Sequence, residues 1–303
     1  LLITSPPFAL LSQKEYGNLS EQHYPKWLCS FGWEVRRVLK DTGSFVLDMG
    51  HAYLPGVPVR SLYNYRTLIY LCDVVGFYLA HEFFMYNPSM IPSPAEWVSK
   101  RRLRIKGAVN TVWWLSKTEW PKADNRKVLV SYSKWTQERL GGKAQKREFP
   151  SGHTRREDFY RDNGGSIPSN LLTISGADSN SFYHRISREL NIKRHPARFQ
   201  KAFVEFFLKY LTDPKDIILD IFSGSNTSGH VAEQLKRRWI SIDIRRDYAA
   251  RSAIRFLEKA PAKMIDKIVS RLESGKSYDL RRVLVDQRIE GKVARRDLTE
   301  DIL

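Results

Sequence analysis

The chain has 303 residues and a hydrophobic content of 42%, which is enough for a sizeable core in one large domain or two smaller ones. No apolar run reaches the roughly 18 residues of a membrane span, and the start lacks the features of a signal peptide, so we expect a soluble protein without a membrane partner. The formal net charge of +17 indicates a polyanionic partner.

Strand and helix patterns alternate over the first 115 residues. Apolar residues at helical spacing predict helices over 24–39 and 65–75. Short β-favouring runs predict strands over 43–48, 81–86 and 109–115, and we expect Trp113 and Trp114 in the sheet core. This order predicts a mostly parallel α/β sheet, with residues 1–115 as its first half.

Residues 116–192 break the pattern, because glycine and proline interrupt a polar, basic stretch that has little periodicity. They predict an insert with its own loops. Much of the positive charge lies nearby: residues 100–162 hold 17 Lys and Arg against 7 Asp and Glu, whereas residues 277–303 hold 6 of each. This charge could form a solvated face or a surface that follows a phosphate backbone, and the tryptophans of the segment favour the second interpretation.

The α/β pattern returns at residue 193 and continues to 262. An apolar stripe at helical spacing predicts a helix over 199–211, and an unbroken apolar run predicts a buried strand over 217–222. A glycine-rich turn, a helix to 236, a strand over 239–243 and a helix over 247–259 follow. Residues 193–262 are therefore the second half of the sheet, and residues 263–303 form a C-terminal helix and tail.

The turn after the strand at 217–222 has the features of a nucleotide-cofactor site. Asp220 ends the strand, Gly224 and Gly229 lie in the turn, and Asp243 ends the next strand 23 residues later. Glycine lets the backbone approach a ligand closely, and an acid at this place accepts hydrogen bonds from ribose hydroxyls. The spacing is not G-x-G-x-x-G, so an ordinary strand-to-helix turn is the alternative.

The tetrapeptide Ser5-Pro6-Pro7-Phe8 stands near the start of the chain, after the apolar residues Leu1–Ile3 and Thr4. The two prolines fix the backbone and remove two N–H donors, so the carbonyls of Ser5 and Pro6 are acceptors without a local partner. The Ser5 side chain adds an acceptor, and Phe8 adds a flat face. This set suits the exocyclic amine of a planar base, although an isolated tetrapeptide could equally be a proline-stopped strand with a core Phe.

Together, the cofactor turn and the S-P-P-aromatic strand end resemble the amino-methylating DNA methyltransferases, which use S-adenosylmethionine. The Ser variant is typical of enzymes that methylate the N4 amine of a flipped cytosine. The order of the motifs resembles the circularly permuted beta class, in particular its PvuII-type cytosine-N4 modification branch. The resemblance implies a Rossmann-like class I methyltransferase fold, with the basic insert as the target-recognition region.

Roles follow from the resemblance by motif. It implies that Ser5, Pro6, Pro7 and Phe8 are catalytic and that the cofactor contacts the following residues: His195, Arg198, Phe199, Asp220, Phe222, Gly224, Asn226, Thr227 and Asp243. For His195, a capping or core role is an equal alternative. The C5-cytosine branch is disfavoured, because it needs a Pro-Cys nucleophile and neither Cys29 nor Cys72 follows a proline.

The resemblance also implies partners: double-stranded DNA, and a cognate restriction endonuclease that acts on the same site without a stable complex. It suggests a CAGCTG-like recognition sequence. The two cysteines in apolar segments indicate a reducing, cytoplasmic environment, and the histidines show no metal-ligand spacing, so we expect no metal.

The family carries a further strand and an acidic turn before its S-P-P-aromatic motif, and we expect the chain to be truncated there. Three other functions stay open at this point. They are methylation of adenine N6, a DNA-binding remnant without catalysis, and an RNA or protein methyltransferase on the same scaffold.

Overall fold

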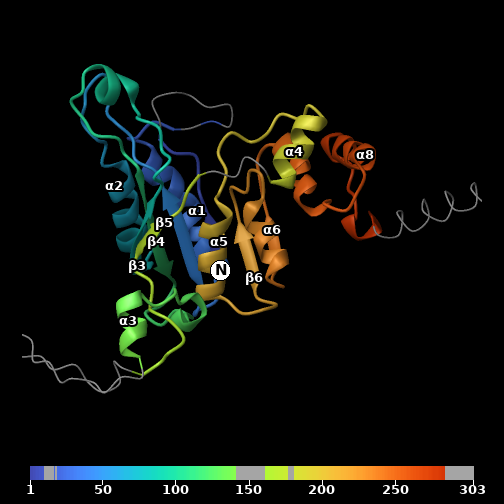
Figure 1. Cartoon of the computed structure of the whole chain (residues 1–303). Helices are drawn as coiled ribbons and strands as arrows, with labels where there is room; N and C mark the ends of the chain where they lie inside the picture. Colours follow the sequence, from blue (N-terminus) through green and yellow to red (C-terminus); the bar gives the residue numbers. More distant parts are fainter. Residues whose placement is uncertain (10–16, 18, 141–160, 177–180, 284–303) are drawn as a thin grey trace, which may run out of the picture.

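The computed structural model describes the chain except for residues 10–16, 18, 141–160, 177–180 and 284–303. Its centre is a seven-stranded sheet in the order β5-β3-β4-β2-β1-β6-β7 (Figure 1). The strands are β1 (Leu2–Thr4), β2 (Ser44–Met49), β3 (Tyr78–Tyr86), β4 (Val109–Ser116), β5 (Leu171–Thr173), β6 (Ile217–Asp220) and β7 (Arg238–Ser241).

The sheet is mostly parallel, as predicted, with one exception. The pairs β1–β2, β1–β6, β6–β7 and β3–β5 are parallel, whereas β4 runs antiparallel to both of its neighbours, β2 and β3. The chain passes from β3 to β4 through residues 87–108, whose only helical turn is the π-helical Glu96–Lys100. Antiparallel neighbours need no crossover helix, so this connection can turn back at one edge of the sheet.

Figure 1 shows helices on both faces of the sheet, α4 and α8 beyond the side of β6, and α3 below the strands. They are α1 (Tyr24–Val38), α2 (Tyr63–Ile69), α3 (Lys134–Arg139), α4 (Phe182–Glu189), α5 (Lys201–Leu211), α6 (Thr227–Gln234), α7 (Arg246–Ser252) and α8 (Ala262–Glu273). The helix expected over 65–75 begins at Tyr63 as α2 and ends in a π-helical turn, Tyr70–Val74. The helix expected over 247–259 is shorter: α7 passes into a 3-10 turn at Ala253–Phe256.

Two hydrophobic clusters hold the layers together. One joins α1 and α2 to one face of the sheet, and the other joins α5 and α6 to the opposite face. Neighbouring residues of a strand point to opposite faces, so Trp113 belongs to the first cluster and Trp114 to the second. Both side chains are buried, which confirms their predicted place in the core.

The predicted insert, residues 116–192, contributes to three different places. Residues 117–128 lie at the edge formed by the amino ends of the parallel strands, where Lys122 forms salt bridges of 2.7 Å with Asp213 and with Asp216. Strand β5 joins the sheet beside β3. Helix α4 packs with the 3-10 turn after α7 and with α8 in a third hydrophobic cluster. The described part is therefore not one separate body, and residues 141–160 lie outside the description.

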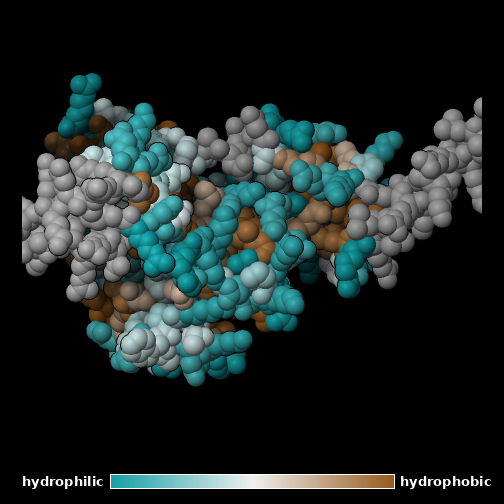
Figure 2. All heavy atoms as spheres, turned by 60° about the horizontal axis from the view of Figure 1, so that its bottom comes forward, coloured by the Kyte–Doolittle hydropathy of each residue, from teal (hydrophilic) through white to brown (hydrophobic). Residues whose placement is uncertain are grey.

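Three lysines at the amino-end edge, including Lys122, are paired with acids. Lys127 also bonds to Asp213, and Lys117 lies 3.4 Å from Asp41. Hydrogen bonds from Lys122 and Lys127 lower the pKa of Asp213 to about 2. Figure 2 brings this edge toward the viewer and shows hydrophilic residues with hydrophobic patches among them. Within the residues described, no helix has the length and apolar character needed to cross a membrane.

Candidate active site

The tetrapeptide Ser5–Phe8 directly follows β1, at the edge formed by the carboxyl ends of the parallel strands. All four of its residues line one cavity of about 850 Å³. The ring of Phe8 lies against Gly50, where an added Cβ would stand 2.4 Å from the ring. A side chain at position 50 would therefore push Phe8 out of its place, so this glycine is required by close packing.

Asp48, near the end of β2, lies directly behind Ser5. The Ser5 hydroxyl donates to Oδ2 of Asp48 at 3.0 Å, and the Asn110 amide donates to Oδ1 at 3.1 Å. Asp48 is 5% exposed, and burial raises its pKa to about 6 although both hydrogen bonds lower it. Because the Ser5 proton points to Asp48, the lone pairs of the Ser5 oxygen remain available to a donor in the cavity.

Asp220, at the end of β6, fixes the glycine-rich turn. Its carboxylate accepts hydrogen bonds from the Thr4 hydroxyl at 2.6 Å, from the Phe222 backbone N–H at 3.1 Å and from the Ser228 hydroxyl. Burial raises its pKa to about 6. Asp220 is not among the residues that line the cavity; it joins the strand before the tetrapeptide to the turn that follows β6.

Asn226 and Thr227 also lie beneath the turn rather than on the cavity wall. Asn226 adopts the left-handed conformation, with φ 54°, and its Oδ1 accepts from the Gly229 N–H at 2.9 Å and from the Ser241 hydroxyl at 2.6 Å. It therefore caps α6 at its amino end. Thr227 is buried in the first turn of that helix. The cofactor contacts predicted for these two residues and for Asp220 remain predictions.

The other predicted cofactor residues line the cavity: Phe222, Gly224, Asp243, His195, Arg198 and Phe199. The two oxygens of Asp243 accept from the backbone N–H groups of Gly224 at 2.8 Å and Arg245 at 2.9 Å. These bonds fix the carboxylate at the rim of the turn. Each oxygen keeps a free acceptor position, because a carboxylate oxygen can accept two hydrogen bonds.

His195 lies over Gly224. An added Cβ at Gly224 would stand 3.1 Å from the imidazole, and the backbone there has a positive φ of 49°. The other side of the imidazole makes an edge contact with Tyr248, with ring centroids 4.4 Å apart. Burial lowers the pKa of His195, which favours the neutral ring. The histidine thus forms a wall of the cavity above the turn.

An aromatic group closes the side of the cavity next to α1. Phe222 makes ring contacts with Trp27 and Phe31 of α1, with centroids 5.7 Å and 5.1 Å apart. On the opposite side, Phe199 stacks on Phe203 of α5. A planar ligand could therefore lie between apolar walls while the polar groups of the turn hold its ends.

The cavity fits a nucleoside cofactor with a base beside it. Its volume of about 850 Å³ is within the range of small-molecule sites. Gln200 lines it, and Oε1 of Gln200 is buried without a hydrogen bond from the described residues. A buried acceptor of this kind needs a donor, which a ligand amine or hydroxyl would supply. Within the described ranges, no group of three or more His, Cys, Asp or Glu side chains is placed to hold a metal ion.

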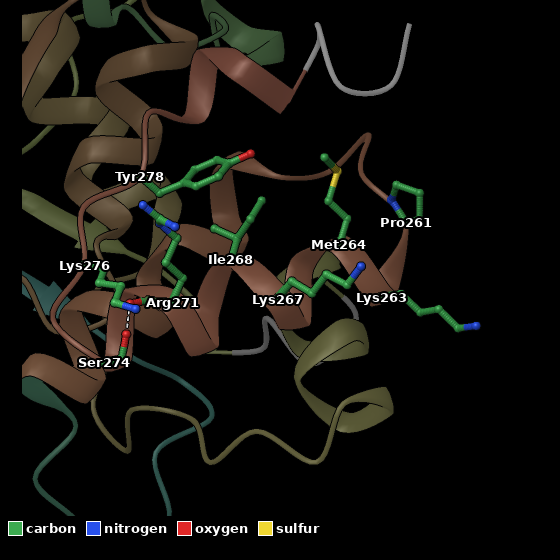
Figure 3. A pocket seen from close by; sticks show the side chains of 9 residues that line it. All are labelled: Pro261, Lys263, Met264, Lys267, Ile268, Arg271, Ser274, Lys276 and Tyr278. Atoms are coloured by element: carbon green, nitrogen blue, oxygen red, sulfur yellow. Dashed lines mark hydrogen bonds between the residues drawn. The ribbon is translucent and has the colours of Figure 1, made fainter. Parts of the chain in front are cut away.

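A second cavity, of about 650 Å³, lies along α8 (Figure 3). Ile268 and Met264 line it together with four basic residues, Lys263, Lys267, Arg271 and Lys276. It shares no residue with the first cavity, and none of the predicted site residues lines it. The first cavity is therefore the candidate active site.

The sequence pattern of the DNA methylase family matches residues 1–254. The chain belongs to this family. Among its relatives, the Type II methyltransferase M.PvuII of Proteus hauseri is 49% identical over 94% of this chain and 86% of that protein. The Type II methyltransferase M.BglII of Bacillus subtilis is more distant, at 22% identity over 82% of this chain and 61% of that protein.

Solved structures agree with this assignment. The PvuII DNA methyltransferase, described as cytosine-N4-specific, superimposes with a TM-score of 0.75 at 47% identity, over 92% of this chain and 87% of that chain. A DNA modification methylase of Thermus thermophilus, in complex with S-adenosyl-L-methionine, has a TM-score of 0.51 at 16% identity and 86% coverage of both chains. The predicted class I methyltransferase fold is therefore confirmed.

Sequence reasoning missed Asp48, Asn110 and Gln200 as site residues. Asp48 has a recognisable signal, since it is the one charged residue in the buried strand Ser44–Met49. Asn110 and Gln200 have no such signal, because their place beside the cavity depends on the pairing of β4 with β2 and on the start of α5.

Proposed function

We propose that this chain is a site-specific DNA methyltransferase that acts on the exocyclic N4 amine of a flipped cytosine, the activity classified as EC 2.1.1.113. The observation that carries the proposal is the Ser5–Asp48–Asn110 chain of hydrogen bonds at the base end of the cavity. The cytosine-N4 specificity of the similar PvuII enzyme supports the choice of target atom.

The residues of the tetrapeptide accept and orient the amine. The Ser5 oxygen and the Pro6 carbonyl accept hydrogen bonds from the two N–H groups of the amine. These hydrogen bonds withdraw the nitrogen lone pair from conjugation with the ring. Pro7 holds the backbone in the required conformation, because its φ is fixed. Phe8, braced against Gly50, stacks on the base. A base reaches these groups only after it has left the duplex.

When bound, S-adenosylmethionine would supply a sulfonium methyl group, so that the amine nitrogen would form the new N–C bond and the electron pair of the S–C bond would go to sulfur. The methylated amine then loses a proton. Ser5 accepts a hydrogen bond from the amine and donates one to Asp48, so this pair offers the proton a route away from the base. Asp48 acts through Ser5 and is a positioning residue.

The opposite end of the cavity would hold the cofactor. Asp243 would accept from the ribose hydroxyls, and Gly224 would let the backbone approach the methionine part. His195, Arg198 and Phe199 would close over that part, with Phe222 against the adenine side. Asp220, Asn226 and Thr227 support the turn beneath these groups.

The same relatives support a proposal for the biological setting. We infer that the chain modifies double-stranded DNA in a restriction–modification system in the cytoplasm, and that the cognate endonuclease reads the same site without forming a stable complex with it. The target-recognition role of residues 116–192 is part of this proposal, although residues 117–128 lie at the edge of the sheet away from the cavity.

The test is mass analysis of nucleosides from DNA that the purified chain has methylated. N4-methylcytosine is the expected product. N6-methyladenine would move the assignment to the adenine branch, since the same acceptors suit either exocyclic amine. Absence of any product, together with no calorimetric signal for S-adenosylmethionine, would support a DNA-binding remnant instead.

A further inference from the structure

The connection between β3 and β4 carries an unusual distribution of polar and apolar side chains. Along Leu103–Lys106 the two apolar side chains are exposed, Leu103 to 62% and Ile105 to 90%. The two cations between and after them are also exposed, and both bond to backbone carbonyls. Arg104 Nε donates to the Pro58 carbonyl at 2.6 Å, and Lys106 Nζ donates to the carbonyls of Pro88 and Met90, each at 3.2 Å.

All four side chains of this stretch are exposed, the two cations included. The bonds from Arg104 and Lys106 to backbone carbonyls fix the course of the segment, while Leu103 and Ile105 make no such bond and lie open on the surface. Ile91, in the same connection, is 73% exposed. Leu103 and Ile105, two residues apart, are a small apolar surface of the kind that a partner molecule covers only where neighbouring groups attract that partner.

The position of this segment points to what covers it. Ala108 lines the active-site cavity, and Ile105 is three residues away, so the two lie within roughly 11 Å even if the chain is extended. Gly107 between them packs on His51, where a Cβ would stand 2.3 Å from the imidazole. The segment Leu103–Lys106, called the tip below, is thus held next to the cavity proposed for the flipped base. It lies at the upper left of Figure 1.

The charges around the tip favour DNA over an apolar protein surface. Lys100, Arg101 and Arg102 precede it, and Glu96 is the acid that pairs with the first two. Cations around a small apolar tip fit a duplex whose phosphates surround stacked bases. Proteins that distort DNA use Leu and Ile in this way, as apolar side chains inserted between bases.

We propose that Leu103 and Ile105 form a wedge that enters the base stack where the target cytosine leaves it. This inference rests on the proposed function, because it assumes that a base is flipped into the cavity. The wedge would fill the gap in the stack and so favour the extrahelical base. It would neither contact the cofactor nor take part in the transfer of the methyl group.

The experiment compares Ile105→Ala and the double variant L103A/I105A with wild type on two duplexes, one with a paired target cytosine and one with a mispaired target. Loss of the wedge should slow single-turnover methylation of the paired duplex by about 10-fold or more, and that of the mispaired duplex by less than about 3-fold, since mispairing lowers the cost of flipping. Ile69→Ala, an exposed residue of α2, is the matched control and should leave both rates unchanged.

A second readout does not depend on methylation. Fluorescence of 2-aminopurine placed beside the target rises when its neighbour leaves the stack, and the variants should reduce this rise. Equal slowing on both duplexes would overturn the wedge. So would a normal fluorescence rise accompanied by loss of self-association in sedimentation, which would assign the tip to a second copy of the chain. If wild type gives the fluorescence change but no N4-methylcytosine, the proposed function fails and the wedge stands.

Discussion

The change Asp48→Asn should have opposite effects on two properties of the protein: it should raise the stability of the fold and lower the rate of methylation. Burial raises the pKa of Asp48 from 3.8 to about 6, so the folded protein binds this proton more tightly than the unfolded chain does. Wild type therefore loses stability as the pH rises from about 4 through 6. The difference between a pKa of 3.8 and one of about 6 corresponds to a loss of stability of about 3 kcal/mol, which is complete above about pH 7.

The amide has nearly the same shape and carries no charge, so the variant avoids this cost. At pH 8 it should be more stable than wild type by up to about 3 kcal/mol, and the difference should vanish near pH 4. Urea unfolding at several pH values measures this difference directly.

The same change should impair catalysis. An amide has one acceptor oxygen, whereas both Ser5 and Asn110 donate to the carboxylate of Asp48. If the new NH2 group faces Ser5, the Ser5 proton turns into the cavity and opposes the N–H of the target amine. We expect the single-turnover rate to fall by about 100-fold, with unchanged affinity for S-adenosylmethionine. A variant with full activity, or one destabilised equally at every pH, would refute the role of Asp48.

Three further changes test the cofactor end and the DNA surface. Gly224→Ala places a Cβ 3.1 Å from the imidazole of His195 at a positive φ; calorimetry should show weaker cofactor binding, and an unchanged Kd would contradict the close approach. Asp243→Ala should raise the Kd of S-adenosylmethionine by about 10-fold or more and leave the rate at saturation nearly unchanged, since it removes only ground-state contacts; an unchanged Kd would exclude the ribose contact. Arg102→Ala should lower the slope of log K against log salt for DNA by about 1, whereas Arg126→Ala at the opposite edge should leave it unchanged; equal slopes for the two variants would contradict the placement of DNA.

Those parts of the candidate site that consist of short contiguous motifs could be predicted from the sequence. Ser5–Phe8 and the turn after Asp220 are short contiguous motifs, and the structure places both at the carboxyl edge of the sheet, joined by the Thr4–Asp220 hydrogen bond. The alternation of strand and helix patterns predicted the α/β sheet, and the resemblance that these motifs carry implied the class I methyltransferase fold.

The remaining features depend on which strands are neighbours. Asp48 and Asn110 meet because β2 pairs with β4 and β1 lies on the other side of β2. No periodicity in the sequence reports that pairing. The antiparallel direction of β4 was likewise not visible in the sequence, because it follows from the connection between β3 and β4.

The count of charged residues along the sequence was the least reliable way to predict the DNA-binding surface. For residues 100–162 the sequence favoured a surface that follows a phosphate backbone over a solvated face, yet Lys122 and Lys127 bond to acids about 90 residues further along the chain. A sum of charges over a segment cannot show such pairing. The exposure of Leu103 and Ile105 beside the cavity was equally hidden, since it depends on how Arg104 and Lys106 attach this segment to residues 58, 88 and 90.

The most direct test of the amine clamp is the single-turnover methylation rate of Ser5→Ala at saturating S-adenosylmethionine. The variant keeps the backbone carbonyls and loses the hydroxyl that links the amine to Asp48. A rate reduced by about 100-fold, with cofactor and DNA affinities unchanged, is the predicted result. A rate equal to that of wild type would contradict the account.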